Sequence, residues 1–124
     1  MFKTEINKER PQSNKFYSLG SRKAGIHHAR IRMKCSALHY DLYTNHLTDS
    51  PACTCGQNVE DAIHYFFVCP NYNMQRAILH DEIIQYAPFN LHTILHGAND
   101  VSQPVNEILA NAIHKYIDNT TRFY

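Results

Sequence analysis

Three cysteines and one histidine lie within 17 positions near the middle of the chain. They follow the pattern C-x-C-x8-H-x4-C, and the set consists of Cys53, Cys55, His64 and Cys69. Structural zinc sites use four sulfur or imidazole ligands in a tetrahedron, at about 2.0–2.3 Å from the ion. The spacing therefore predicts one structural Zn²⁺ ion, bound within residues 53–69.

The two halves of this set need different local structures. Residues i and i+2 of an extended segment face the same side, so Cys53 and Cys55 can reach one ion from a single turn. Gly56 then lets the chain fold back. Asn58, followed by acidic residues at 60 and 61, predicts the start of a helix that carries His64.

Cys69 follows His64 by five residues, one more than the helical repeat. Pro70 ends or bends this helix, because proline lacks an N–H and its ring clashes with the preceding turn. We expect the loosened last turn to swing the Cys69 thiolate back towards the other ligands.

Each of these residues also has an ordinary interpretation. A free cysteine is often a small buried apolar residue, and a histidine beside aromatic residues is often part of a core. Disulfides are a second alternative, but Cys-x-Cys is too close to pair comfortably, and an intracellular compartment disfavours the oxidised form. The four residues taken together favour a metal site.

An amphipathic pattern precedes the cysteines. Between residues 25 and 47, apolar side chains recur at three- and four-residue steps. The expected stripe consists of Ile26, Ala29, Met33, Ala37 and Tyr40, and Leu38 and Leu42 widen it. Ser36 can divide this range into two helices by capping the second.

Helical patterns also follow the cysteines. We expect a helix over residues 71–86, a short turn over residues 90–97 that is capped by Asn90, and a last helix started by Ser102 and Pro104. In this last helix, residues 105–117 follow the amphipathic template. A core stripe is the simplest interpretation, and a groove for a partner helix is the alternative.

These elements define one small domain. Its 124 residues allow a single modest core, and no alternating apolar pattern predicts strands. We expect an all-α or nearly all-α fold, a small helical domain with a Cys3His zinc-knuckle-like turn. Residues 1–20 are expected to form an irregular basic leader, and residues 21–124 the helical zinc-binding domain.

The charge is divided unevenly along the chain. Residues 1–34 hold nine basic and two acidic residues, a net charge of +7, whereas residues 35–124 hold three basic and nine acidic residues, a net charge of −6. A basic segment favours contact with a polyanion, because binding to phosphates releases counterions. The candidate nucleic-acid surface consists of Arg22, Lys23, His27, His28, Arg30, Arg32 and Lys34, with Phe16 and Tyr17 as possible base-stacking rings. A solvated helix face is the alternative.

Two further pairs of residues could do chemistry. His92 and His96 are four residues apart, but no glutamate follows His92 as a His-Glu-x-x-His protease would require, so both are expected at the surface. Cys35 and His39 lie one turn apart, but no third group that would orient a nucleophile is evident.

Several short strings between residues 30 and 76 occur together in one known family. They are Arg30-Ile31-Arg32, Cys35-Ser36-Ala37-Leu38, Asp41-Leu42-Tyr43, Ser50-Pro51-Ala52-Cys53-Thr54-Cys55-Gly56, Glu60-Asp61, His64-Tyr65-Phe66-Phe67 and Cys69-Pro70-Asn71-Tyr72, with Arg76. Over about Phe16 to Leu79 the chain resembles the C-terminal tail of jockey-like non-LTR retrotransposon reverse transcriptases.

This resemblance implies a zinc-knuckle-like element that follows a polymerase and handles the RNA or the DNA target of a mobile element. It implies that Cys53, Cys55, His64 and Cys69 are the metal ligands, and that Cys35 packs near the helix junction. It carries no motif beyond Tyr86.

The residues of the polymerase and nuclease of such elements are missing from this sequence. It contains no Asp-Asp pair, no Pro-Asp and no Asp/Glu-x-Lys triplet. We therefore expect no enzyme, but a non-catalytic, zinc-stabilised module that binds RNA or DNA with little sequence specificity. The alternatives are a zinc-stabilised module that binds a protein through its acidic C-terminal helices, and a nonfunctional remnant of a retroelement.

Hydropathy gives an expectation of the compartment. The longest aliphatic and aromatic stretch, residues 65–68, is far too short to span a bilayer. The first residues lack the apolar region of a secretory signal. An intracellular protein, nuclear or cytoplasmic and without membrane contact, is expected.

Overall fold

The computed structural model describes residues 21–124, and the expected irregular leader over residues 1–20 lies outside this range. The described elements are α2 (Arg22–Arg32), α3 (His39–Thr44), the π-helix η1 (His64–Val68), the 3-10 helix η2 (Pro70–Tyr72), α4 (Asn73–Ile83), α5 (Leu91–His96) and α6 (Gln103–Thr120). Between residues 21 and 124 the structure has no strand and only an isolated bridge from Ala52 to Val59. The expected all-α fold is confirmed.

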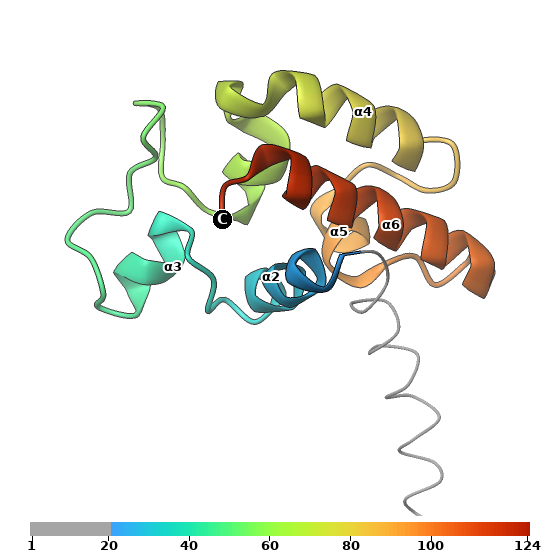
Figure 1. Ribbon diagram of the computed structural model, residues 1–124, viewed down its shortest axis with the longest axis horizontal. Coiled ribbons are helices and arrows are strands. Elements are labelled where there is room, and N and C mark those ends of the chain that lie inside the picture. Colours follow the sequence, from blue (N-terminus) through green and yellow to red (C-terminus); the bar gives the residue numbers. More distant parts are fainter. Residues whose placement is uncertain (1–20) are drawn as a thin grey trace, which may run out of the picture.

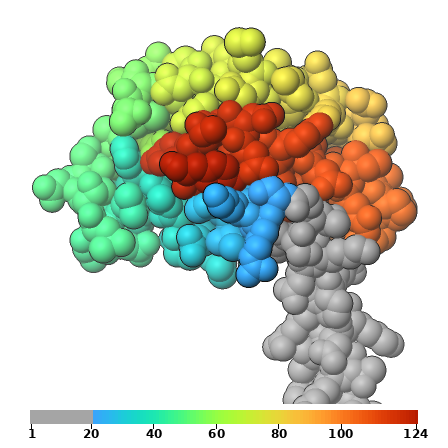
Figure 2. Space-filling model, in the orientation of Figure 1, coloured from blue at the N-terminus to red at the C-terminus, as the bar shows by residue number. Residues whose placement is uncertain are grey.

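Helix α6 is the centre of the fold. It packs against α4 on one side and against α2 and α5 on the other, as Figures 1 and 2 show. Its buried stripe confirms the amphipathic pattern and contains Leu109, Ala112, Ile113, Tyr116 and Ile117. Ile108 differs from the prediction, because it is 42% exposed. None of the described helices is long and apolar enough to cross a bilayer.

The predicted break between α2 and α3 is present, but its geometry differs from a simple cap. Leu38, not Ser36, is the residue that precedes α3. The Ser36 hydroxyl instead donates to Asp41 Oδ2 at 2.6 Å and accepts the Leu38 N–H at 3.2 Å. Ser36 therefore organises the start of α3 from two residues further upstream.

The predicted buried face of α2 is wrong. Ile26 and Met33 are 41% and 58% exposed, and α2 instead buries Ala24, Gly25, His28 and Ile31. The spacing of Ala24, His28 and Ile31 is also that of a helical face, but it contains a polar residue. Its burial requires hydrogen bonds that the sequence does not reveal.

His28 supplies those hydrogen bonds in the interior, where it is completely buried. Its Nδ1 lies 2.9 Å from His114 Nε2 on α6, and its Nε2 lies 2.7 Å from the Ile94 carbonyl oxygen on α5. His28 thus ties α2 to both neighbouring helices. The expectation that it contacts nucleic acid is corrected, because no part of its side chain reaches the surface.

The elements after Pro70 are close to the prediction. The helix expected over residues 71–86 is shorter and occupies Asn73–Ile83, after the 3-10 turn that Pro70 starts. Asn90 caps α5, because its side-chain oxygen accepts the Thr93 N–H at 2.9 Å. Gly97 ends α5 with a positive φ of 79°, which glycine adopts without strain.

The buried histidine pair predicts an acid-sensitive fold. Burial, and then the electrostatic interaction with His114, lowers the pKa of His28 to about 3. The unfolded chain therefore takes up a proton near pH 6.5 that the folded chain resists, so the free energy of unfolding should fall as the pH drops from about 6.5 to 3. His96 and Arg32 also oppose protonation of His28.

Chemical denaturation of the wild type and of His28→Gln between pH 7 and pH 4 measures this effect. The glutamine amide can keep the bond to the Ile94 carbonyl but does not titrate. We expect the wild type to lose more stability than the variant over this range. Equal losses would show that other groups cause the acid sensitivity.

Candidate metal centre

A short hairpin carries the first two cysteines. Its arms are joined where the Cys53 N–H donates to the Asn58 carbonyl at 3.1 Å and the Glu60 N–H to the Pro51 carbonyl at 2.8 Å. Gly56 turns the chain with φ of 85°. Asn58 has φ of 50°, a left-handed conformation that asparagine tolerates better than most residues. The predicted tight turn is confirmed, but Asn58 belongs to it and does not start a helix.

The helix that carries His64 starts at Asp61 instead. The Asp61 carboxylate accepts the His64 N–H at 2.8 Å, which is the role of an N-terminal cap. From His64 to Val68 the chain then forms a π-helix. The Cys69 N–H donates to the His64 carbonyl at 2.8 Å, a bond across five residues where an α-helix would span four.

This wide turn explains how Cys69 reaches the site. We predicted that Pro70 would loosen the last turn, and the helix does end before Pro70. The structure achieves the return of Cys69 by widening the whole turn, so that His64 and Cys69 lie on the same side despite their five-residue separation.

The carbonyl groups that the π-helix leaves open receive side-chain donors. In a π-helix the Tyr65 carbonyl would accept the N–H of residue 70, but Pro70 has none. The Tyr116 hydroxyl of α6 donates to this carbonyl instead, at 2.5 Å. Arg76 of α4 donates from Nε to the Phe66 carbonyl at 3.0 Å and from Nη2 to the Cys69 carbonyl at 2.7 Å. Helices α4 and α6 therefore fix the backbone that presents His64 and Cys69.

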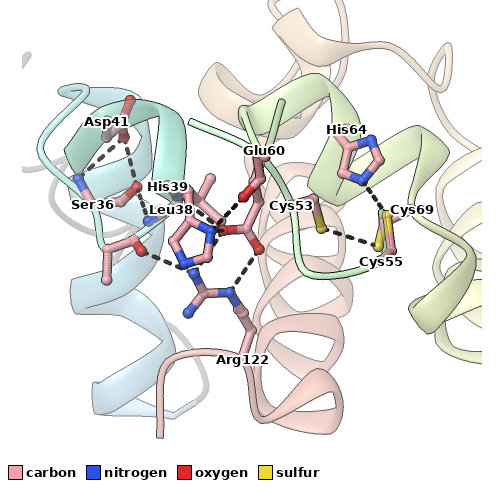
Figure 3. A network of polar contacts seen from close by, with 12 residues as sticks. Ser36, Leu38, His39, Asp41, Cys53, Cys55, Glu60, His64, Cys69 and Arg122 are labelled. Atoms are coloured by element: carbon pink, nitrogen blue, oxygen red, sulfur yellow. Dashed lines mark hydrogen bonds and ion pairs between the residues drawn. The ribbon is translucent and has the colours of Figure 1, made fainter. Parts of the chain in front are cut away.

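The four predicted ligands meet at one point between the hairpin and the π-helix (Figure 3). Their ligand atoms all lie within 4.8 Å of one another. Cys53 Sγ is 3.8 Å from Cys69 Sγ, and Cys55 Sγ is 3.3 Å from His64 Nε2. Two sulfur atoms bound tetrahedrally to zinc at about 2.3 Å are about 3.8 Å apart. The group can hold a metal ion.

Burial and electrostatics at the site also suit a cation. Cys53, His64 and Cys69 are buried, whereas Cys55 is half-buried at the rim. Burial raises the pKa of Cys53 to about 12, and it also raises the pKa of Cys69. Two neighbouring buried thiols need a positive charge beside them to become thiolates, and a divalent metal ion supplies that charge.

A buried ion pair connects the hairpin to the rest of the fold. Glu60, at the end of the hairpin, is 2% exposed and accepts Nε and Nη2 of Arg122 on separate oxygens, both at 2.7 Å. Glu60 also accepts the His39 N–H at the start of α3, at 2.9 Å. Burial acts to raise the pKa of Glu60, but the hydrogen bonds from Arg122 and His39 outweigh it and hold this pKa below its ordinary value.

Ligand spacing alone did not reveal this support. In the sequence, Arg76 is part of the family strings, and Arg122 is one of the three basic residues of the acidic segment 35–124. Both are cations in a segment that has few, and this is the one feature of the sequence that could have pointed to a structural role for them. Their partners, a helix-terminal carbonyl and a carboxylate 62 positions away, depend on the tertiary fold.

The predicted nucleic-acid residues other than His28 lie on or next to α2. Arg22, Lys23, Arg30, Arg32 and Lys34 are exposed. His27 is half-buried, and its ring stacks on Phe123 with centroids 4.8 Å apart. Burial, and then the charges of Arg30 and Lys23, lower the pKa of His27. Phe16 and Tyr17 lie outside the described residues.

The remaining candidates form no site in the described range. Cys35 is exposed, which corrects the expectation that it packs at the helix junction. His39 bonds through Nδ1 to the Ala52 carbonyl at 2.7 Å, so its ring supports the hairpin. His92 and His96 are exposed on α5, as predicted.

Comparisons of the chain with protein-family models, with curated proteins and with solved structures find no match.

Proposed function

We propose that Cys53, Cys55, His64 and Cys69 bind one structural zinc ion. The observation that carries this proposal is the convergence of the four ligand atoms to within 4.8 Å. Three thiolates and one imidazole select zinc over magnesium or calcium, which prefer oxygen ligands. Four protein ligands complete the tetrahedron, which leaves no open position for a substrate, so the role of the ion is to stabilise the fold.

The zinc-stabilised domain would present α2 to a nucleic acid. Helix α2 carries four cationic side chains and no carboxylate in its eleven residues. The exposed residues Arg22, Lys23, Arg30 and Arg32, with Lys34 directly after the helix, can contact phosphates without reading a sequence. The proposed function is therefore a non-catalytic module that binds RNA or DNA, in an intracellular compartment.

The origin that we propose is the tail of a non-LTR retrotransposon reverse transcriptase. The support is the combined set of strings around the ligands, in which Asp61, Arg76 and Pro70 each have a structural task in the folded site. A string whose members cooperate physically is a stronger sign of relationship than ligand spacing alone.

A protein partner is the second candidate, and one surface favours it. Helices α4 and α6 border a groove of about 350 Å³ that is lined by Glu82, Gln85, Tyr86, Ile108, Asn111, Ala112 and Lys115. It includes the exposed Ile108 of the otherwise buried stripe. A pull-down that survives nuclease treatment would favour this candidate.

The zinc content of protein purified without added metal tests the first part of the proposal. We expect about one zinc per wild-type chain and little or none in Cys69→Ser. Removing the metal with a chelator should lower the melting temperature by on the order of 10 °C or more, because metal-binding energy in small domains is folding energy. Cys35→Ser is the matched control, since Cys35 is exposed and outside the cluster. Equal zinc in both variants would reject the site.

Binding to nucleic acid at several salt concentrations tests the second part. Arg30→Ala and Arg32→Ala should each weaken binding to all sequences alike. Each should also reduce the slope of log K against log salt by about 0.7–0.9, which is the contribution of one phosphate contact. Lys115→Ala is the control, because Lys115 lies on α6 and pairs with Glu82. Binding that is absent, or independent of salt, would contradict the proposal.

A further inference from the structure

The last residues of the chain fold back onto α2. Helix α6 ends at Thr120, and Thr121 reverses the chain with a left-handed φ of 52°. Phe123 then lies flat on the His27 ring, with an interplanar angle of 14°. The Tyr124 ring lies next to it, 5.7 Å from the His27 centroid. Three rings from distant parts of the sequence thus form one cluster on α2.

Cationic side chains lie next to this cluster. Lys23, His27 and Arg30 follow each other at helical spacing and share one face of α2. Lys23 Nζ is 5.5 Å from the centre of the Tyr124 ring, and the Arg122 guanidinium carbon is 5.5 Å from the centre of the Phe123 ring. Tyr124 is 52% exposed. The half-exposed Tyr124 ring therefore lies next to the basic residues of α2.

The rings are fixed in place. Arg122 is held by buried Glu60 and by the Ala37 carbonyl at 3.0 Å. Phe123 packs edge-on against buried Tyr65, with centroids 5.4 Å apart. The Tyr124 hydroxyl donates to Asp118 Oδ1. Because residues 122–124 are already held by these contacts, ordering the segment would cost little of the binding free energy of a ligand.

We propose that this cluster is a stacking platform for single-stranded nucleic acid. An unpaired base stacks on the exposed part of Tyr124, and the phosphates on either side contact Lys23 and Arg30. The proposal rests on the nucleic-acid binding proposed above and specifies its substrate class. A duplex does not fit this role, because its bases are already stacked on one another, whereas an unpaired base offers a free face.

Asp118 limits the orientation of the bound strand. Its carboxylate lies at the hydroxyl end of Tyr124 and repels phosphates there. The cations lie over the rings themselves, Lys23 over Tyr124 and Arg122 over Phe123. The backbone of the strand therefore runs along the α2 side of the rings, and the base reaches across Tyr124.

Affinity for a fluorescent 12-nucleotide oligouridylate, compared with a 12-base-pair duplex, tests the platform. Replacing Tyr124 by Leu keeps apolar bulk but removes the aromatic face. We expect Tyr124→Leu to bind the single strand about 5- to 100-fold more weakly, the usual loss when one stacking ring is removed. The salt slope should not change, because no phosphate contact is lost. Tyr124→Phe keeps the ring but loses the bond to Asp118. It should lose much less affinity than Tyr124→Leu, because Arg122 and Phe123 still anchor the segment.

Crosslinking gives a readout that does not depend on affinity. With 5-bromouridine in the oligonucleotide, irradiation and mass spectrometry should locate the crosslink on Tyr124. Zinc content and melting temperature of both variants check that the fold is intact.

The outcomes separate this inference from the proposed function. If the wild type binds the oligouridylate but Tyr124→Leu binds it equally well, or if the duplex binds as tightly as the single strand, the platform is rejected while nucleic-acid binding stands. If the wild type binds neither probe, both proposals fail. Loss of affinity in Tyr124→Leu alone, with a crosslink at Tyr124, supports the platform.

Discussion

The structure of the metal centre depends on one backbone hydrogen bond, from the Cys69 N–H to the His64 carbonyl. Because this bond spans five residues, it widens the turn and places both ligands on one side. The widened turn takes the Cys69 N–H away from the Tyr65 carbonyl, and Pro70, which has no N–H, leaves the Phe66 carbonyl without its ordinary helical donor. Tyr116 and Arg76 donate to these carbonyls, so the turn that sets the ligand geometry is also tied to α6 and α4.

The opposite side of the site is supported by charge. Glu60 follows the hairpin that carries Cys53 and Cys55, and its carboxylate is shared between Arg122 and the start of α3. A buried carboxylate is costly unless its oxygens are satisfied, and the two-point contact with Arg122 meets that requirement. The ion pair thereby joins the hairpin to residues 122–124, which lie on α2. It therefore connects the candidate metal centre to the basic surface.

The sequence predicted the convergence of three cysteines and one histidine and most of the helices, but it failed where tertiary contacts decide the structure. Cys53, Cys55, His64 and Cys69 could be predicted to converge because few residue types are able to bind a metal such as zinc, and these four lie close together in the sequence. The α6 stripe was found because its period is strong. His28 was predicted at the surface, because it lies in a basic segment beside His27 and no local pattern marks it as buried. Its burial depends on the contacts with His114 and with the Ile94 carbonyl, which only the tertiary fold supplies. The π-helix was not predicted, because the expected spacing of residues on a helix assumes hydrogen bonds between residues four positions apart.

The segment before the π-helix shows why a metal ion would matter to this fold. From residue 45 to residue 60, only Cys53 and Glu60 are buried. One is a proposed ligand, and the other belongs to the ion pair with Arg122. Sixteen residues without a buried apolar core cannot offset their conformational entropy by the hydrophobic effect. Their structure must come from other contacts. The Arg122 ion pair holds the segment to the helical core at Glu60, and a metal ion bound to Cys53 would hold it at a second point.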